Sequence, residues 1–234
     1  MKQNKLLFLG LLGLCLVLGL EYFTDIDIWL ENKFYNPQNK EWLINPAKHK
    51  ELTIFFYDGL KRVIVVFLAC CLLNMLLSIK IKSIRQYNHF CLVMLFSFIL
   101  IAGLIAGAKS FTNVYCPYQL DIYNGLYPFV KILESYPDNF IQPKIGRCFP
   151  AGHATAGFAF LGLFYAFKKK SYRLWGLTCG LLLGWIAGIY QMLRGQHFLS
   201  HTLFSMIAAL MRLIVVKKLT QKIEHKYPNL TISN

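Results

Sequence analysis

Residues 194–216, with the sequence RGQHFLSHTLFSMIAALMRLIVV, join a short polar turn to a long apolar run. The run over residues 198–216 is long enough to cross the hydrocarbon core of a bilayer, which takes about 17 to 25 residues. His197 immediately precedes this run, and His201 falls within its first turn. This stretch therefore predicts a transmembrane helix with two histidines at one end.

The whole chain has the composition of a membrane protein. Of its 234 residues 56% are hydrophobic, and the mean hydropathy is +0.45. A soluble domain would expose too much of this apolar surface to water. The sequence predicts an all-α fold, a bundle of six transmembrane helices that forms a single integral membrane domain over residues 1–234. The predicted spans are residues 6–20, 63–79, 90–108, 149–167, 174–193 and 198–216.

The net charge of +14 is distributed unevenly along the chain. Lysines and arginines gather near both termini and in the segments 80–85 and 168–173, whereas all but one of the acidic residues lie within residues 21–62 and 109–148. Short basic loops stay in the cytoplasm. We therefore expect both termini inside and the segments 21–62 and 109–148 outside. This arrangement accounts for the basic residues and argues against a nucleic-acid partner.

A third histidine lies where the fourth predicted span begins, in the sequence FPAGH of residues 149–153. His153 would lie in the first turn of a helix, where unpaired backbone N–H groups attract anions, and Gly152 would let a ligand approach the backbone closely. A histidine in this position can donate a proton to the leaving oxygen of a phosphoester. It can equally anchor the helix at the headgroups, and this residue alone does not decide between the two roles.

His197 and several cations are predicted to meet His153 at one membrane face. Neutral imidazole is a competent nucleophile towards phosphorus. Arg194 precedes His197 by three residues, a spacing that points both side chains to similar faces of a helical turn. Lys109 and Arg147 add two more cations. A guanidinium group can donate two parallel hydrogen bonds to the oxygens of one phosphate. Any one of these cations could simply extend to the headgroups, but their arrival beside two histidines favours a phosphate site.

These residues resemble the motifs of the type 2 phosphatidic acid phosphatase (PAP2) superfamily. The family pattern has three blocks, which are Lys-x6-Arg-Pro, Pro-Ser-Gly-His and Ser-Arg-x5-His-x3-Asp. Residues 109–117 correspond to the first block, residues 150–153 to the second, and His197 to the histidine of the third. The strings RCFPAGH and RGxHFxSH also resemble a variant branch of bacterial membrane members. The resemblance implies a PAP2-like catalytic core over about residues 100–205.

Four positions depart from the family pattern. Cys116, Ala151, Gln191 and His201 stand where the family has arginine, serine, arginine and aspartate. The arginines at positions 147 and 194 lie near two of the vacated places and could keep the phosphate-binding charge. Because the family aspartate orients the nucleophile, we expect His201 to accept a hydrogen bond from His197. The alternative is a non-catalytic protein that only binds anionic headgroups.

The function that the resemblance implies is a metal-independent lipid phosphatase. His197 would form a phosphohistidine intermediate, His153 would protonate the leaving oxygen, and His201 would be the third catalytic residue. The expected phosphate-binding residues are Lys109, Arg147, Arg194 and Gly152. No cofactor is implied, and the histidines and acidic residues lack the spacing of a metal site.

The implied substrate is a lipid phosphate or diphosphate, such as lipid A, undecaprenyl diphosphate, phosphatidate or phosphatidylglycerophosphate. The protein is expected in the bacterial inner (cytoplasmic) membrane, with its site facing the periplasm or exterior. A lipid-to-lipid phosphotransferase would use the same intermediate and stays an alternative. The only partners expected are the lipid substrate and the bilayer, since the sequence identifies no protein partner.

Two of the seven cysteines are predicted to lie outside the spans. Cys116 and Cys148 both fall at the external side, and we expect a disulfide between them in an oxidising compartment. It would close a loop of about 33 residues and stabilise the fold by roughly 3 to 4 kcal/mol. Two free thiols are the alternative.

Overall fold

The computed structural model describes residues 2–103, 107–109 and 111–230. Helices account for most of them, with a single two-stranded hairpin in the described residues. The α-helices are α1 (Lys2–Phe23), α2 (Ile26–Glu31), α3 (Lys50–Leu52), α4 (Leu60–Leu77), α5 (Asn88–Ser97), α7 (Gly152–Phe158), α8 (Leu163–Ala166), α9 (Lys170–Met192) and α10 (Leu199–Lys226). Two π-helical segments, η1 (Thr53–Gly59) and η3 (Phe98–Gly103), adjoin α4 and α5. The 3-10 segments are η2 (Lys82–Tyr87), η4 (Pro117–Gln119), η5 (Asp121–Tyr123), η6 (Ala159–Gly162) and η7 (Pro228–Leu230).

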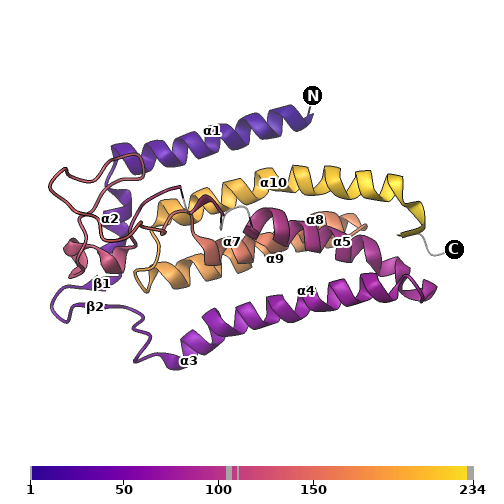
Figure 1. Ribbon diagram of the computed structural model, residues 1–234, viewed down its shortest axis with the longest axis horizontal. Coiled ribbons are helices and arrows are strands. Elements are labelled where there is room, and N and C mark those ends of the chain that lie inside the picture. The colour runs from indigo at the N-terminus through magenta and orange to yellow at the C-terminus, as the bar shows by residue number, and fades with distance from the viewer. Residues whose placement is uncertain (1, 104–106, 110, 231–234) are drawn as a thin grey trace.

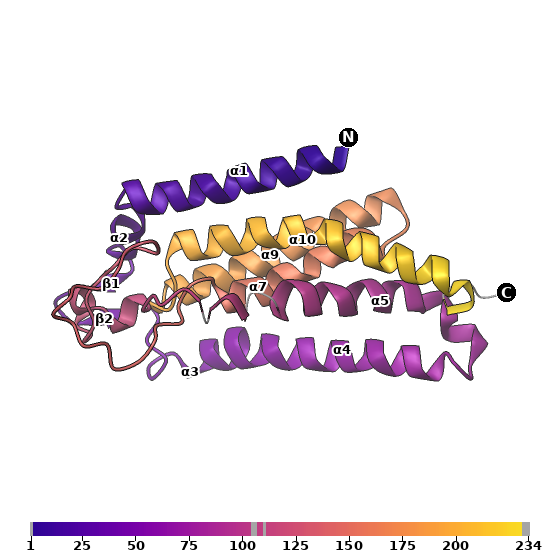
Figure 2. The same ribbon diagram turned by 45° about the horizontal axis from the view of Figure 1, so that its top comes forward.

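Five helical runs in the described residues are long and apolar enough to cross a membrane. They lie side by side in an elongated bundle (Figures 1 and 2). Apolar side chains cover the outer faces of the bundle, for example Phe8 on α1 and Val66 on α4, which are 65% and 62% exposed. Such faces are expected where lipid replaces water as the solvent. The runs are Asn4–Phe23, Lys50–Leu77, Lys82–Gly103, Lys170–Met192 and Leu199–Lys226.

The segment predicted to be the fourth span does not form one long helix. Residues 152–166 form three consecutive short pieces, α7, η6 and α8, which together reach only about 22 Å at 1.5 Å per residue. This is less than the hydrocarbon thickness of about 30 Å. Ala154, Phe158 and Leu161 are at most 1% exposed, so the segment is an inner helix of the bundle. Five of the six predicted spans therefore have a helix of spanning length, and residues 104–106 of the predicted third span lie outside the described residues.

Glycines on α9 bring the inner helix close. Gly176, Gly180, Gly184 and Gly188 recur at every fourth residue and face the segment from α7 to α8 or the start of α10. A Cβ added at Gly184 would overlap the ring of Phe158. Small residues at this spacing let two helix backbones approach closely, as in many membrane bundles. This packing fixes the position of α7 relative to α9.

The two segments predicted to be external cover one end of the bundle, opposite both termini (Figures 1 and 2). The first contains α2 and the hairpin of β1 (Tyr35–Asn36) and β2 (Glu41–Trp42), in which Tyr35 pairs with Trp42. The rings of Tyr35, Trp42 and Tyr123 pack together with centroids 5.1 to 5.2 Å apart. Trp42 also occupies the space that a side chain at Gly195 would need. Residues 21–62, the first segment predicted to be external, thus pack on the turn after α9.

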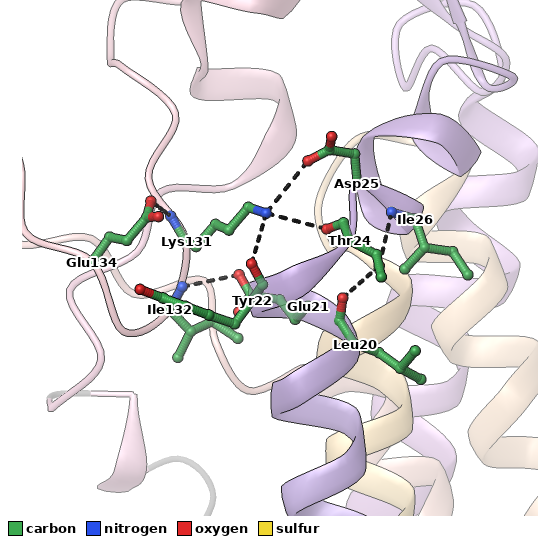
Figure 3. Close-up of polar contacts among 9 residues, drawn as sticks. All are labelled: Leu20, Glu21, Tyr22, Thr24, Asp25, Ile26, Lys131, Ile132 and Glu134. Atoms are coloured by element: carbon green, nitrogen blue, oxygen red, sulfur yellow. Dashed lines mark hydrogen bonds and ion pairs between the residues drawn. The ribbon is translucent and has the colours of Figure 1, made fainter.

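Lys131 ties the second external segment to the end of α1 (Figure 3). Its ammonium donates a hydrogen bond of 2.9 Å to the carbonyl oxygen of Tyr22 and lies 3.4 Å from the carboxylate of Asp25. The backbone N–H of Ile132 donates to the carboxylate of Glu21 at 3.0 Å. The two external segments therefore form one cap on the bundle.

Candidate active site

His153 lies in the first turn of α7, where it meets Lys109. A Cβ added at Gly152 would lie 3.2 Å from Nζ of Lys109, so the ammonium is directly over this glycine. The ring of Tyr57, from η1, lies 4.6 Å from that of His153 between centroids. Lys109 is partly buried, and burial lowers its pKa. The glycine that was expected to admit a ligand thus has a cation beside it.

His197 is buried between α9 and α10, with 3% of its surface exposed. Its Nδ1 lies 3.4 Å from Sγ of Cys148. Burial, and after it the positive charge of Lys109, lower the pKa of His197 well below its usual 6.5. The imidazole is therefore neutral at neutral pH, which is the state that can attack phosphorus.

The expected hydrogen bond between His197 and His201 is not formed in the described residues. The two ring centroids are 5.8 Å apart, and Nδ1 of His201 is buried without a partner there. His201 lies in the first turn of α10, where its ring packs edge-on against Phe149 and Phe198. This packing holds it away from His197, and the sulfur of Cys148 contacts Nδ1 of His197 instead.

A disulfide joins Cys116 to Cys148, with their Cα atoms 5.0 Å apart. It links the loop that follows Lys109 to the turn that precedes His153. Both sulfurs lie with His197 in a group whose possible ligand atoms are within 4.8 Å of one another. While the disulfide is intact, however, the sulfurs offer no thiolate to a metal ion.

Arg194 does not share a helical face with His197. α9 ends at Met192, and Gly195 adopts a left-handed backbone with φ of 65°, so the spacing of three residues does not act as a helical turn. The guanidinium instead lies over the rings of Tyr57 and Tyr190, at 5.6 and 5.2 Å. Its Nε and Nη1 are buried without a hydrogen-bond partner in the described part of the chain.

A cavity of about 440 Å³ lies beside these groups. His153, Lys109, Arg147 and Gly152, all predicted as site residues, line it together. His197 does not line it, and Arg194 borders a neighbouring pocket with Trp42. The rest of the lining is mostly apolar and comes from η1, α4, η3 and α7, namely Phe56, Tyr57, Leu60, Lys61, Ile64, Val65, Ala102 and Ala156.

Lys61 is a cation of this cavity that sequence reasoning missed. It lies in the first turn of α4, and its charge acts on His153. The only signal in the sequence was a basic pair, Lys61 and Arg62, directly before the second predicted span. Such a pair is usually explained by contact with headgroups.

Asp27, from α2, was also missed. Its carboxylate accepts hydrogen bonds from the hydroxyl and from the backbone N–H of Ser200, the latter at 2.9 Å. Ser200 belongs to the first turn of α10, where backbone N–H groups lack partners within the helix. Asp27 is buried, which raises its pKa. It therefore fixes the start of the helix that carries His201 and follows His197.

The sequence was compared with known protein families, with curated proteins and with solved structures. The PAP2 superfamily matches residues 86–224, which is more than half of the chain. No curated protein and no solved structure matches. The matched residues include the three histidines, the disulfide and every predicted phosphate-binding residue.

Proposed function

Because the chain belongs to the PAP2 superfamily, whose members are phosphatases that often act on lipid phosphates, we propose that it is a membrane lipid phosphatase with its site at the cavity beside His153. The proposed reaction is hydrolysis of a lipid phosphate or diphosphate through a phosphohistidine at His197. The proposed location is a bacterial inner membrane, with the cap formed by the two external segments facing the periplasm.

The observation that carries this proposal is a group of cations without acidic partners. None of the ion pairs among the described residues includes Lys61, Lys109, Arg147 or Arg194. Arg194 is the strongest case, since two of its nitrogens are buried without a hydrogen-bond partner among the described residues. A buried charge without a counter-charge is costly. A phosphate group bound beside these residues would supply the missing negative charge and accept their hydrogen bonds.

The proposed chemistry has two displacements at phosphorus. In the first, the neutral ring of His197 forms a P–N bond and the P–O bond to the lipid breaks. Burial and the neighbouring cations lower the pKa of His153 to about 4 in the free protein, so the negative charge of the bound phosphate must keep His153 protonated until it gives that proton to the departing oxygen. In the second, His153 takes a proton from water, the water oxygen forms a new P–O bond, the P–N bond breaks, and both His197 and protonated His153 are regenerated. Lys109, Arg147 and Arg194 would stabilise the charge that develops on the phosphate oxygens in both steps.

The position of His197 adds a requirement to this mechanism. His197 is buried and does not line the cavity, whereas Lys109 lines the cavity and its charge acts on His197. Substrate binding must therefore open a path from the cavity to His197, and we propose that a movement of the side chain of Lys109 opens it. The four-carbon stem of lysine allows this movement while its ammonium stays with the phosphate.

The test is phosphate release by the purified chain from phosphatidate, phosphatidylglycerophosphate, undecaprenyl diphosphate and lipid A, with a chelator present. We expect release from at least one lipid and a loss of at least about a thousandfold in His197→Ala, because the nucleophile is removed. His225→Ala is the matched control, since His225 is an exposed histidine near the other end of α10. It should retain full activity.

Release that persists in His197→Ala would contradict the proposed mechanism, and no release from any lipid would contradict the proposed function. Transfer of the phosphate to a second lipid in place of water would identify a phosphotransferase. In intact cells, hydrolysis of an added short-chain lipid phosphate that cannot cross the membrane would support an external site. Hydrolysis only after lysis would place the site inside.

A further inference from the structure

One face of the η1–α4 segment forms a wall of the cavity. Tyr57, Lys61, Ile64 and Val65 all line it, and Lys61, Ile64 and Val65 lie four, seven and eight residues after Tyr57. This spacing places side chains on one side of a helix. The wall therefore presents one aromatic ring and one ammonium near the catalytic histidine, followed by two aliphatic side chains further along α4.

Lys61 is free to bind an anion in the cavity. None of the ion pairs among the described residues includes it. Asp58 is the nearest acidic residue along the chain, and it borders, with Lys61 and Arg62, a groove on α4 that does not include His153. Lys61 and His153 line the same cavity. The pKa of His153 is lowered chiefly by burial, and the charge of Lys61 adds to that effect after those of Lys109 and Arg194.

The order of groups along the cavity suggests which anion Lys61 meets. Lys109, Arg147 and His153 mark the end where phosphorus would react, and Leu60, Ile64 and Val65 offer an apolar surface to a lipid chain. Lys61 lies on the same helix as these apolar residues. A substrate with its chain on α4 and its terminal phosphate at His153 would hold a second, lipid-linked phosphate close to Lys61.

We propose that Lys61 is a specificity-determining residue that binds the lipid-linked phosphate of a diphosphate substrate. This inference rests on the proposed function, because it assumes that the terminal phosphate is the one that reacts. A lipid monophosphate has no group in that place, so Lys61 favours diphosphates over monophosphates. Lys61 lies outside the segment that matches the PAP2 superfamily.

The test compares farnesyl diphosphate with farnesyl monophosphate, which share one apolar chain, on the full-length protein in detergent micelles. Wild type should show the lower KM for the diphosphate. Lys61→Gln should raise that KM by about tenfold, the usual effect of one charge-assisted hydrogen bond, with kcat within about twofold. The KM for the monophosphate should not change, and Lys61→Arg should keep the preference.

Arg62→Gln is the matched control, because Arg62 is a neighbouring exposed cation that does not line the cavity. It should behave as wild type with both lipids. An equal rise in KM for both lipids, or no rise for either, would overturn the proposal. So would a wild type that does not prefer the diphosphate, or an Arg62 variant that loses the preference as Lys61→Gln does.

Binding separates this proposal from the proposed function. A ligand that binds the folded state raises its melting temperature. If wild type releases no phosphate, the proposed function fails, but farnesyl diphosphate should still stabilise wild type more than it stabilises Lys61→Gln. Equal stabilisation of the two proteins would overturn the role of Lys61. Inorganic diphosphate should give a much smaller shift, because it lacks the chain that contacts α4, and an equal shift would show that the lipid is not recognised.

Discussion

Arg194 is a half-buried cation with no acidic partner among the described residues. Its guanidinium is held by the rings of Tyr57 and Tyr190, and two of its nitrogens have no partner in the described residues. Such an arrangement does not stabilise the fold, because a desolvated charge is not compensated. It is expected at a site whose ligand supplies the compensation.

Replacing Arg194 should therefore separate stability from activity. In Arg194→Met the side chain can still pack on the two tyrosine rings, so we expect a melting temperature equal to or above that of wild type. We expect kcat/KM for lipid phosphate to fall by about 100-fold, as for removal of a donor that stabilises transition-state charge. Thermal unfolding and phosphate release measure the two quantities. A variant that loses stability but keeps kcat/KM would show that Arg194 is structural.

At this scale the sequence predicted which residues of the candidate site come together, but it misplaced Arg194 and missed Lys61. Lys109, Arg147 and His153 were predicted to meet, and they line one cavity. Arg194 was placed wrongly relative to His197, because the left-handed backbone at Gly195 ends helical geometry between them. Lys61 was missed, since a lysine before a membrane span has the same local pattern whether it binds headgroups or substrate.

The helices position these residues through close packing of glycines. α7 carries His153 and lies against α9 at Gly184, where the ring of Phe158 fills the space of the missing side chain. Any side chain on this face of α9 would push α7 away. The position of the proton donor therefore depends on glycines that are far from the cavity along the chain.

Gly184→Ala should destabilise the protein by about 1 to 3 kcal/mol, as for other overpacked cores, and should lower activity by displacing α7. Gly19→Ala on α1 is the matched control, because no atom lies within 4 Å of the added Cβ. It should be neutral or slightly stabilising, since alanine favours helix more than glycine does. Chemical unfolding in micelles gives both values. Equal stability of the two variants would contradict the packing argument.

At the level of elements the sequence predicted the long apolar helices but not the cap. Periodicity and hydropathy identify helices that face lipid, and five such helices are present in the described residues. The fourth predicted span is instead a series of short inner helices, whose apolar residues face other helices. Hydropathy does not distinguish protein surroundings from lipid surroundings. The cap depends on contacts between distant segments, such as Asp27 with Ser200 and Trp42 with Gly195, which leave no local pattern.

The whole molecule is polarised along its long axis. The cap lies at one end of the bundle, and both termini lie towards the other (Figure 1). The cavity and the disulfide involve the start of α7 and the segments that join the helices to the cap. Nearly all acidic residues belong to the cap segments or to their junctions with the helices, whereas basic residues gather near the termini and in the segments that share their end. This asymmetry follows the rule that basic segments stay in the cytoplasm. It supports a site that meets lipid headgroups from outside.

The central claim is that His197 forms a covalent bond to the phosphate of a lipid. The measurement that tests it most directly is a rapid quench in alkali of the purified protein mixed with a radiolabelled lipid phosphate, followed by peptide mapping. Phosphohistidine survives alkali and is lost in acid. We predict an acid-labile label on the peptide that contains His197, and none in His197→Ala. Phosphate release by wild type with no label on His197, or with the label on another residue, would contradict the account.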